Sequence, residues 1–164
     1  VLHTLSLHDA LPISLVKDLL PFLRARGYPE RPGDYVAKAV RTLQPRARTL
    51  VEMADALRFF LVDRVEPDPE AARKFLTRAM EQPFEKLISA LDQLETFTEE
   101  GLERVFQQVV TELGIKLGKI AQPVRVALTG TTVSPGLFEI IDVLGKETVL
   151  ERLKSSLDLI RKTS

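Results

Sequence analysis

The sequence predicts an all-α fold made of two small helical subdomains. Apolar residues recur at helical spacing through most of the chain, as in Leu50, Met53 and Leu57. No stretch alternates apolar and polar residues over the length of a strand. The 164 residues are 45% hydrophobic and 28% charged, an ordinary composition for a globular protein, and no apolar run reaches the ~20 residues of a membrane span.

The first 14 residues are excluded from the predicted fold. Their segment TLSLHDALPI is encoded by ACT CTT TCC CTA CAC GAC GCT CTT CCG ATC, a string that resembles a widely used sequencing adapter. We therefore interpret residues 1–14 as a non-native tail, with a helical N-terminal arm as the alternative. The only histidines, His3 and His8, lie in this tail.

The sequence contains few of the residue types that catalysis and metal binding use. The chain has no cysteine, which excludes disulfides and thiolate sites and favours the cytoplasm. Without the tail it also lacks histidine, the commonest general base and metal ligand. Glu99 and Glu103 form a carboxylate pair, but this spacing is common on exposed helix faces. We therefore predict no catalytic residue and no metal site.

The first subdomain is expected over residues 15–96. Ser14 is placed to cap its first helix, Gly27 to end it, and Pro21 predicts a kink or a break within it. GYPERPG then forms a turn, and EPDP forms a linker. The predicted helices cover residues 14–27, 34–44, 46–62, 70–80 and 83–94.

The second subdomain is expected over residues 97–164, after an acidic, polar stretch at residues 94–100. Thr98 is a helix cap with acids in the first turn behind it, and Gly114 ends that helix. Ser134 is predicted to cap a further helix, with Pro135 at its first position. The predicted helices cover residues 98–114, 122–130, 134–145 and 146–160.

Charge is balanced overall but unevenly distributed. Residues 24–48 carry seven basic residues against two acids, whereas residues 81–104 carry seven acids against two basic residues. Residues 116–137 contain three basic residues and no acid. Solvated helix faces explain such runs in many proteins, but two basic segments also suit an anionic partner.

Residues 116–137 combine features that suit single-stranded nucleic acid. Glycines at 117–119 and 129–136 predict two turns, and the second leads into a helix whose first N–H groups are free. Arg125 supplies a planar fork for a phosphate or a base edge. The neighbouring hydroxyls, which donate and accept hydrogen bonds, belong to Thr129, Thr131, Thr132 and Ser134. The alternative is a helical corner in which Arg125 pairs with an acid.

Residues 114–153 closely resemble the C-terminal end of bacterial glutamyl-tRNA synthetases. The resemblance is carried by KLGK at 116–119, QPVR at 122–125, ALTG at 127–130, SPGLFE at 134–139 and LGKE at 144–147. Upstream, LQPRARTLVEMADALRFFL is similar to another helix of that family. The resemblance extends over about residues 14–159.

This resemblance implies an all-helical anticodon-binding region of a class I aminoacyl-tRNA synthetase. The parent enzyme would use ATP and magnesium to join glutamate to tRNA(Glu). The nucleotide-binding signatures of its catalytic domain, His-Ile-Gly-His and Lys-Met-Ser-Lys-Ser, are absent from this sequence. We therefore expect a cytoplasmic, monomeric fragment without a cofactor of its own. Its expected partners are the tRNA(Glu) anticodon loop and the missing catalytic domain, and no membrane.

The resemblance also implies roles for individual residues. Arg125 would contact the middle anticodon base, and Arg46, or alternatively Arg48, would read the third. For Lys116 and Lys119 we expect general attraction to phosphate. The pocket for the first and second bases would be shaped by Ser134, Pro135 and Leu137.

A helical protein-interaction module without RNA binding is the competing hypothesis. It predicts an exposed apolar patch in place of a basic surface. The absence of acids from residues 116–137 favours the anticodon-binding interpretation.

Overall fold

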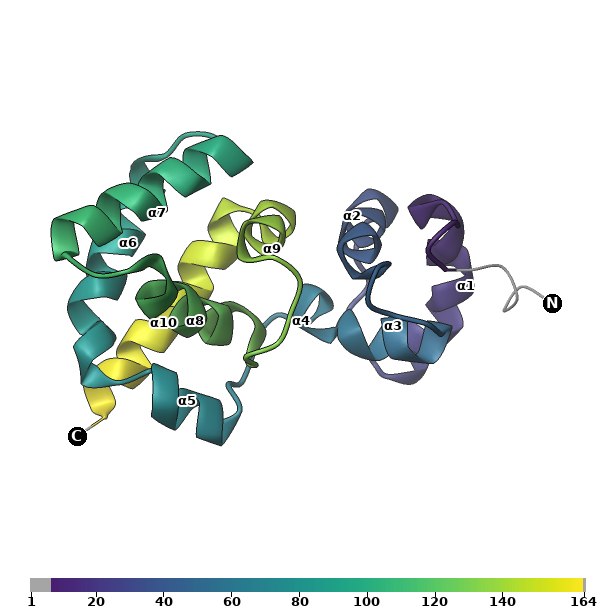
Figure 1. Cartoon of the computed structure of the whole chain (residues 1–164). Helices are drawn as coiled ribbons and strands as arrows, with labels where there is room; N and C mark the ends of the chain where they lie inside the picture. The colour runs from purple at the N-terminus through teal and green to yellow at the C-terminus, as the bar shows by residue number, and fades with distance from the viewer. Residues whose placement is uncertain (1–6, 164) are drawn as a thin grey trace. The chain divides into compact units, whose positions relative to one another are not determined.

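The computed structural model describes residues 7–163, and within this range it contains helices, turns and loops but no strand. This confirms the predicted all-α fold. The chain divides into two compact units, residues 1–63 (unit 1) and residues 64–164 (unit 2). Figure 1 shows the helices of each unit.

Unit 1 is built on the packing of its first helix against the next two. α1 contacts both α2 and α3, and the side chains between them are fully buried, among them Leu19, Val40 and Met53. Burial of each such side chain stabilises the fold by about 1.5–3 kcal/mol. The helices are α1 (Pro12–Ala25), α2 (Gly33–Leu43), α3 (Leu50–Ala56) and α4 (Arg58–Leu61).

The start of α1 differs from the sequence prediction. The helix begins at Pro12 with Leu11 as its N-cap, so Ser14 lies inside the first turn. The Gln44 side chain donates hydrogen bonds to the carbonyls of Leu7 and Ala10, each at 2.7 Å. Residues 7–14 therefore take part in unit 1, although we expected them to be outside the fold. Residues 1–6 of the proposed tail lie outside the described residues.

Two further details of unit 1 concern predicted breaks and helix starts. Of the kink or break predicted at Pro21, the break is excluded, because α1 continues through this exposed residue. The helix expected over residues 46–62 begins only at Leu50, where the Thr49 hydroxyl accepts the Glu52 N–H at 3.1 Å, and it is interrupted at Leu57. Residues 44–49 instead form a turn, in which the Leu43 carbonyl accepts hydrogen bonds from the N–H groups of residues 46 and 47.

Unit 2 packs its helices around the long C-terminal one. α10 contacts α6, α8 and α9, while α7 contacts the same three helices from another direction. Phe84, Phe106 and Ile120 are among its fully buried side chains. Its elements are α5 (Pro69–Phe75), the 3-10 helix η2 (Arg78–Met80), α6 (Glu81–Gln93), α7 (Glu99–Leu113), α8 (Leu117–Thr129), α9 (Leu137–Leu144) and α10 (Lys146–Lys162).

The division between the units does not coincide with the boundary expected at 96/97. α6 and α7 lie on either side of that position, and they pack together within unit 2. The polar stretch at residues 94–98 is a surface connection between packed helices. Polarity alone does not distinguish such a loop from an interdomain linker, because both face water.

The caps predicted for α7 are confirmed. The Thr98 hydroxyl accepts the Gly101 N–H at 3.0 Å, and Gly114 ends the helix with a φ of 65°. A left-handed residue at this position is the usual glycine-dependent way to end a helix.

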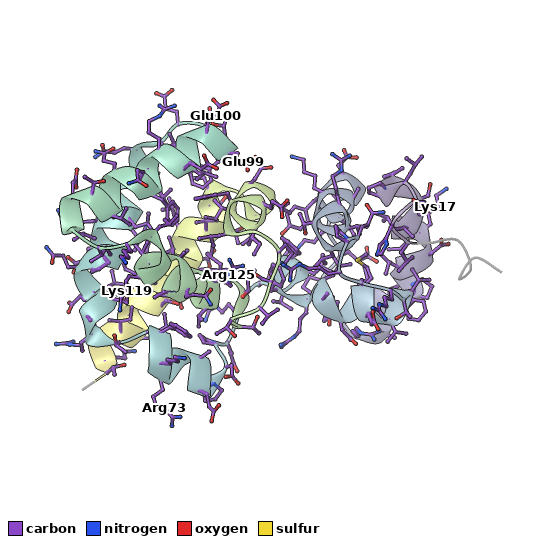
Figure 2. The ribbon with its side chains drawn as sticks, viewed as in Figure 1. Lys17, Arg73, Glu99, Glu100, Lys119 and Arg125 are labelled. Carbon is purple, nitrogen blue, oxygen red and sulfur yellow. The ribbon has the colours of Figure 1, made fainter. Side chains whose placement is uncertain are left out.

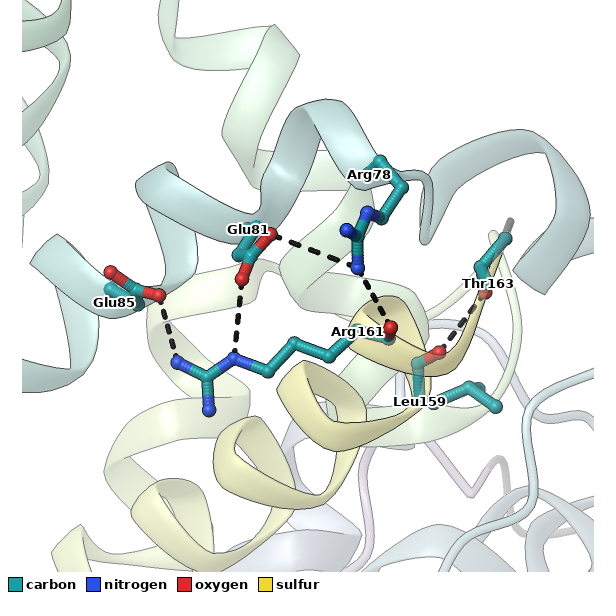
Figure 3. A network of polar contacts seen from close by, with 6 residues as sticks. All are labelled: Arg78, Glu81, Glu85, Leu159, Arg161 and Thr163. Atoms are coloured by element: carbon teal, nitrogen blue, oxygen red, sulfur yellow. Dashed lines mark hydrogen bonds and ion pairs between the residues drawn. The ribbon is translucent and has the colours of Figure 1, made fainter.

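A polar network fastens the end of α10 to the start of α6 (Figure 3). The Arg161 guanidinium donates to the carboxylates of Glu85 at 2.8 Å and Glu81 at 3.3 Å. The hydrogen bond to Glu85 raises the pKa of Arg161 above its usual value. Arg78 donates to the Arg161 carbonyl at 2.7 Å, so the last turn of α10 is held through both side chain and backbone.

No helix within residues 7–163 is long and apolar enough to cross a membrane.

Candidate nucleic-acid interface

The site begins where α8 ends. Gly130 closes the helix with a φ of 84°, and its carbonyl accepts the Asp68 N–H at 2.8 Å. A Cβ at this position would lie 2.8 Å from Val65 Cγ1 and 2.9 Å from the Glu66 carbonyl oxygen. Glycine is therefore required both by the backbone conformation and by the close approach of the segment that precedes α5.

Threonine hydroxyls shape the loop at residues 130–136 from within. The Thr129 hydroxyl donates to the Arg125 carbonyl at 2.8 Å and accepts the Thr131 N–H at 3.2 Å. The Thr131 hydroxyl donates to the Val133 carbonyl at 2.9 Å. We expected these hydroxyls to be available to a ligand, but in the structure they hold the loop in shape. Local bonding of this kind is typical of threonine in turns.

Arg125 is held between α8 and the loop (Figure 2). Its Nε donates to Gln122 Oε1 at 2.9 Å, and its Nη1 donates to the Pro135 carbonyl at 2.6 Å and to the Ser134 hydroxyl. The side chain is half-buried. The structure thus brings together three residues predicted for the site, Arg125, Ser134 and Pro135, and fixes the plane of the guanidinium.

The start of α9 is a correction to the prediction. The helix begins at Leu137 with Gly136 as its N-cap, and Glu139 accepts the Gly136 N–H at 3.2 Å. Ser134 is therefore not the cap, and Pro135 is not the first helical residue. The Ser134 hydroxyl instead accepts from Arg125 and donates to the Pro135 carbonyl at 2.9 Å. Hydrogen bonds from a charged donor are the stronger kind, so the guanidinium holds this hydroxyl in the loop.

The predicted pocket residues are mostly covered. Leu137 is 6% exposed and Ser134 is 9% exposed, so their side chains offer little surface to a base. Val133, which we did not predict, is 76% exposed beside them. A ligand at this loop would meet Val133, backbone groups and the Arg125 guanidinium.

Lys116 and Lys119 lie at the other end of α8. Lys116 is the N-cap of this helix and Lys119 is in its first turn, so residues 117–119 are helical and do not form the expected turn. Both side chains are exposed, and Figure 2 shows Lys119 on the helix. Arg125 follows Lys119 by six residues, about 9 Å along a helix axis.

Arg46 and Arg48 belong to unit 1, in the turn between α2 and α3. Both are exposed, and the intervening Ala47 is 4% exposed, which anchors the turn in the core. The Arg48 N–H donates to Glu52 Oε2 at 2.8 Å. Within residues 7–163, neither guanidinium makes a hydrogen bond or an ion pair. The predicted residues therefore form two groups, one in each unit.

The family model described as an anticodon binding domain matches residues 14–157. The chain belongs to this family.

Relatives of this anticodon-binding domain are glutamate–tRNA ligases. The ligase of Syntrophobacter fumaroxidans (strain DSM 10017 / MPOB) is 64% identical over 154 residues, which are 94% of this chain and 33% of the relative. That of Desulfosudis oleivorans (strain DSM 6200 / JCM 39069 / Hxd3) is 44% identical over 93% of this chain and 33% of the relative. The chain spans about a third of the length of these relatives.

A solved structure supports the fold. The glutamate tRNA ligase from Elizabethkingia meningosepticum CCUG26117, in complex with its amino acid, superposes with a TM-score of 0.82 at 18% identity. The match covers 94% of this chain and 30% of that one.

Within residues 7–163, no group of three or more His, Cys, Asp or Glu side chains could hold a metal ion.

Gln122 is the residue of this anticodon-binding domain that the sequence interpretation missed. It lies three residues before Arg125 on α8, and residues at this spacing are neighbours on a helix surface. The three-residue spacing between Gln122 and Arg125 is the sequence signal that could have identified this hydrogen bond. The amide oxygen of Gln122 limits the orientation of the Arg125 guanidinium.

Proposed function

We propose that this chain is the anticodon-binding part of a glutamate–tRNA ligase and that it binds the anticodon loop of tRNA(Glu). The observation that carries the proposal is the Arg125 guanidinium, which is held in a fixed plane by Gln122, Ser134 and Pro135. A cation fixed before binding loses little freedom when a base arrives. Exposed edges of unstacked bases are what proteins read in single-stranded RNA.

We assign Arg125 to the middle anticodon base. Ser134, Pro135 and Leu137 shape the pocket for the first and second bases, through backbone groups and through the loop conformation that they maintain. Their burial supports this indirect role, because a buried side chain positions its neighbours more effectively than it contacts a ligand.

We assign Arg46, with Arg48 as the alternative, to the third base. The exposed guanidinium on an anchored turn supports this assignment. Cytosine presents two neighbouring acceptors, N3 and O2, on its pairing edge, which match the donors of an arginine fork. At the matching positions of its pairing edge guanine presents the N1–H and N2–H donors, beside a single acceptor, O6. Such a contact discriminates by about 1–3 kcal/mol.

We assign Lys116 and Lys119 to phosphate attraction, which supports binding without base preference. The complete enzyme would attach glutamate to tRNA(Glu) with ATP and magnesium, and its catalytic domain would be the second partner of this chain. The proposal places the protein in the cytoplasm as a monomer. This chain supplies none of the residues for the reaction itself.

Titration of the 164-residue chain with a fluorescent anticodon stem-loop tests the proposal. One RNA carries the glutamate anticodon UUC and the other carries UUG, and each is measured at two salt concentrations. Tighter binding of the UUC form, weakened by salt, is the expected result. Equal binding of both forms would overturn the assignment of Arg46 or Arg48 to the third base. No binding by chain that circular dichroism shows to be folded would favour the protein-interaction module.

A further inference from the structure

One side of α2 carries cations and faces solvent. Residues 36, 39, 40 and 43 point into the core of unit 1, whereas Lys38 and Arg41 are exposed. Residues three apart on a helix are neighbours on the same face. Lys38 and Arg41 thus lie one after the other along the solvent side of the helix, towards its C-terminal end.

This basic side continues into the turn that follows. α2 ends at Leu43, and Arg46 and Arg48 lie in the next turn with exposed side chains. Between Asp34 and Glu52 the sequence contains these four cations and no acid. We call Lys38, Arg41, Arg46 and Arg48 the α2 basic strip.

Three of the five other cations of unit 1 are neutralised by nearby carboxylates, whereas Lys17 and Arg58 form no ion pair among the described residues. Arg24 pairs with Glu30 at 3.5 Å, Arg26 with Asp55 at 2.7 Å and Arg31 with Asp63 at 2.6 Å. Among the described residues, no carboxylate comes within ion-pair distance of the Lys38 or Arg41 side chain.

Two acids lie at the ends of the strip. Asp34 is in the first turn of α2, where the helix dipole favours an anion, and Glu52 accepts the Arg48 N–H. The middle of the strip is a positive surface on a protein whose net charge is zero.

We infer that Lys38 and Arg41 bind backbone phosphates of the tRNA, next to the base that Arg46 or Arg48 reads. This inference rests on the proposed function and adds two contact residues to it. Charge complementarity selects phosphate as the ligand, since exposed cations on a regular helix face attract anions without reading base edges. The contacts fix the register of the RNA on unit 1, while the turn supplies the base preference.

The test is the salt dependence of stem-loop binding by the Lys38→Ala/Arg41→Ala double variant of the whole chain. The slope of log K against log salt is negative, and each phosphate contact that is lost reduces its magnitude by about one. We therefore expect the magnitude of the slope to fall by about two while the preference for UUC over UUG stays at the wild-type ratio. The matched control is Arg104→Ala/Lys154→Ala, which removes the same charge from exposed positions on α7 and α10 of unit 2.

The outcomes separate this inference from the proposed function. A double variant with the wild-type slope, in a protein that still prefers UUC, overturns the phosphate contacts and leaves the function standing. A control variant that reduces the magnitude of the slope equally also overturns the phosphate contacts, because the effect would then come from net charge. If the wild-type chain binds neither RNA, both the function and this inference fail. Circular dichroism of each variant verifies that the fold is intact.

Discussion

The two groups of candidate residues differ in how their arginines are held. In unit 2, Arg125 donates to Gln122, Ser134 and Pro135, so the free protein already fixes its orientation. In unit 1, Arg46 and Arg48 project from an anchored turn into solvent. A held arginine has a structural role besides the binding role proposed for it, whereas an exposed one has to lose side-chain entropy when it binds. Substitutions in the two groups should therefore have different consequences.

The largest effect is expected from Gly130→Ala, which disturbs the loop that holds Arg125. The new Cβ would clash with Val65 and with the Glu66 carbonyl, at a φ of 84° that alanine rarely adopts. The left-handed conformation costs about 1–2 kcal/mol, and overpacking typically costs about 1–3 kcal/mol more. Chemical denaturation should show unit 2 destabilised by about 2–5 kcal/mol, with weaker RNA binding.

Gly118→Ala is the matched control for Gly130→Ala. Gly118 lies in α8 with no heavy atom within 4 Å of an added Cβ. Alanine is the better helix former by roughly 0.5–1 kcal/mol, so this variant should be as stable as the wild type or slightly more stable. Equal destabilisation by the two substitutions would contradict the role assigned to Gly130.

Arg125→Ala is expected to reduce both stability and binding. The Ser134 hydroxyl would lose its donor and the Pro135 carbonyl would lose one of its two donors, which costs about 1–3 kcal/mol in a partly buried site. Loss of the proposed base contact should weaken stem-loop binding by ~1–3 kcal/mol. Thermal unfolding and fluorescence anisotropy measure the two effects separately.

Arg125→Lys is the companion variant, because it keeps the charge and lacks the planar fork. We expect Arg125→Lys to keep the salt dependence of the wild type and to lose the preference for uracil at the middle anticodon position. An Arg125→Ala protein that binds weakly but unfolds like the wild type would show that the hydrogen bonds to the loop contribute nothing to stability.

The difference between the two groups also explains what the sequence could predict. The predicted caps of α7 are confirmed because Thr98 and Gly114 act on their own helix. Ser134 carries the same kind of signal, yet its hydroxyl bonds to Arg125, nine residues away. Local patterns do not show which donor a hydroxyl meets after the chain has folded.

Tertiary packing explains the other differences between the sequence prediction and the structure. The polar stretch before α7 resembles a linker in composition, but α6 and α7 pack against each other across it. Likewise, the exposure of Lys38 and Arg41 depends on which face of α2 the core covers. The roles of Arg46 and Arg125 came from family resemblance, since one sequence does not show which exposed cation meets a base.

Arg46→Ala should change base preference with little effect on stability. The side chain is exposed, and within the described chain its guanidinium has no partner to lose. We expect the difference in binding free energy between UUC and UUG to shrink by about 1–3 kcal/mol, with the unfolding midpoint unchanged. Arg48→Ala is measured in parallel, and an effect confined to that variant would transfer the third-base assignment to Arg48.

The smallest effect is expected from Gln122→Ala, which tests whether orientation of Arg125 matters for binding. The substitution removes one acceptor of the guanidinium and leaves those from Ser134 and Pro135 in place. A hydrogen bond from a charged donor contributes about 1.5–3 kcal/mol. Because two other acceptors still hold the guanidinium, only part of this is lost from binding, which should weaken by roughly 2–10-fold. Gln122→Glu keeps an acceptor for Arg125 Nε, and it should therefore retain the preference for uracil at the middle anticodon position while its added negative charge lowers overall affinity. Gln107→Ala is the control, since Gln107 is an exposed glutamine on α7 that donates to Thr111 at 3.4 Å. If Gln122→Ala and Gln107→Ala bind RNA equally well, the Ser134 and Pro135 contacts alone orient Arg125, and Gln122 has no part in recognition.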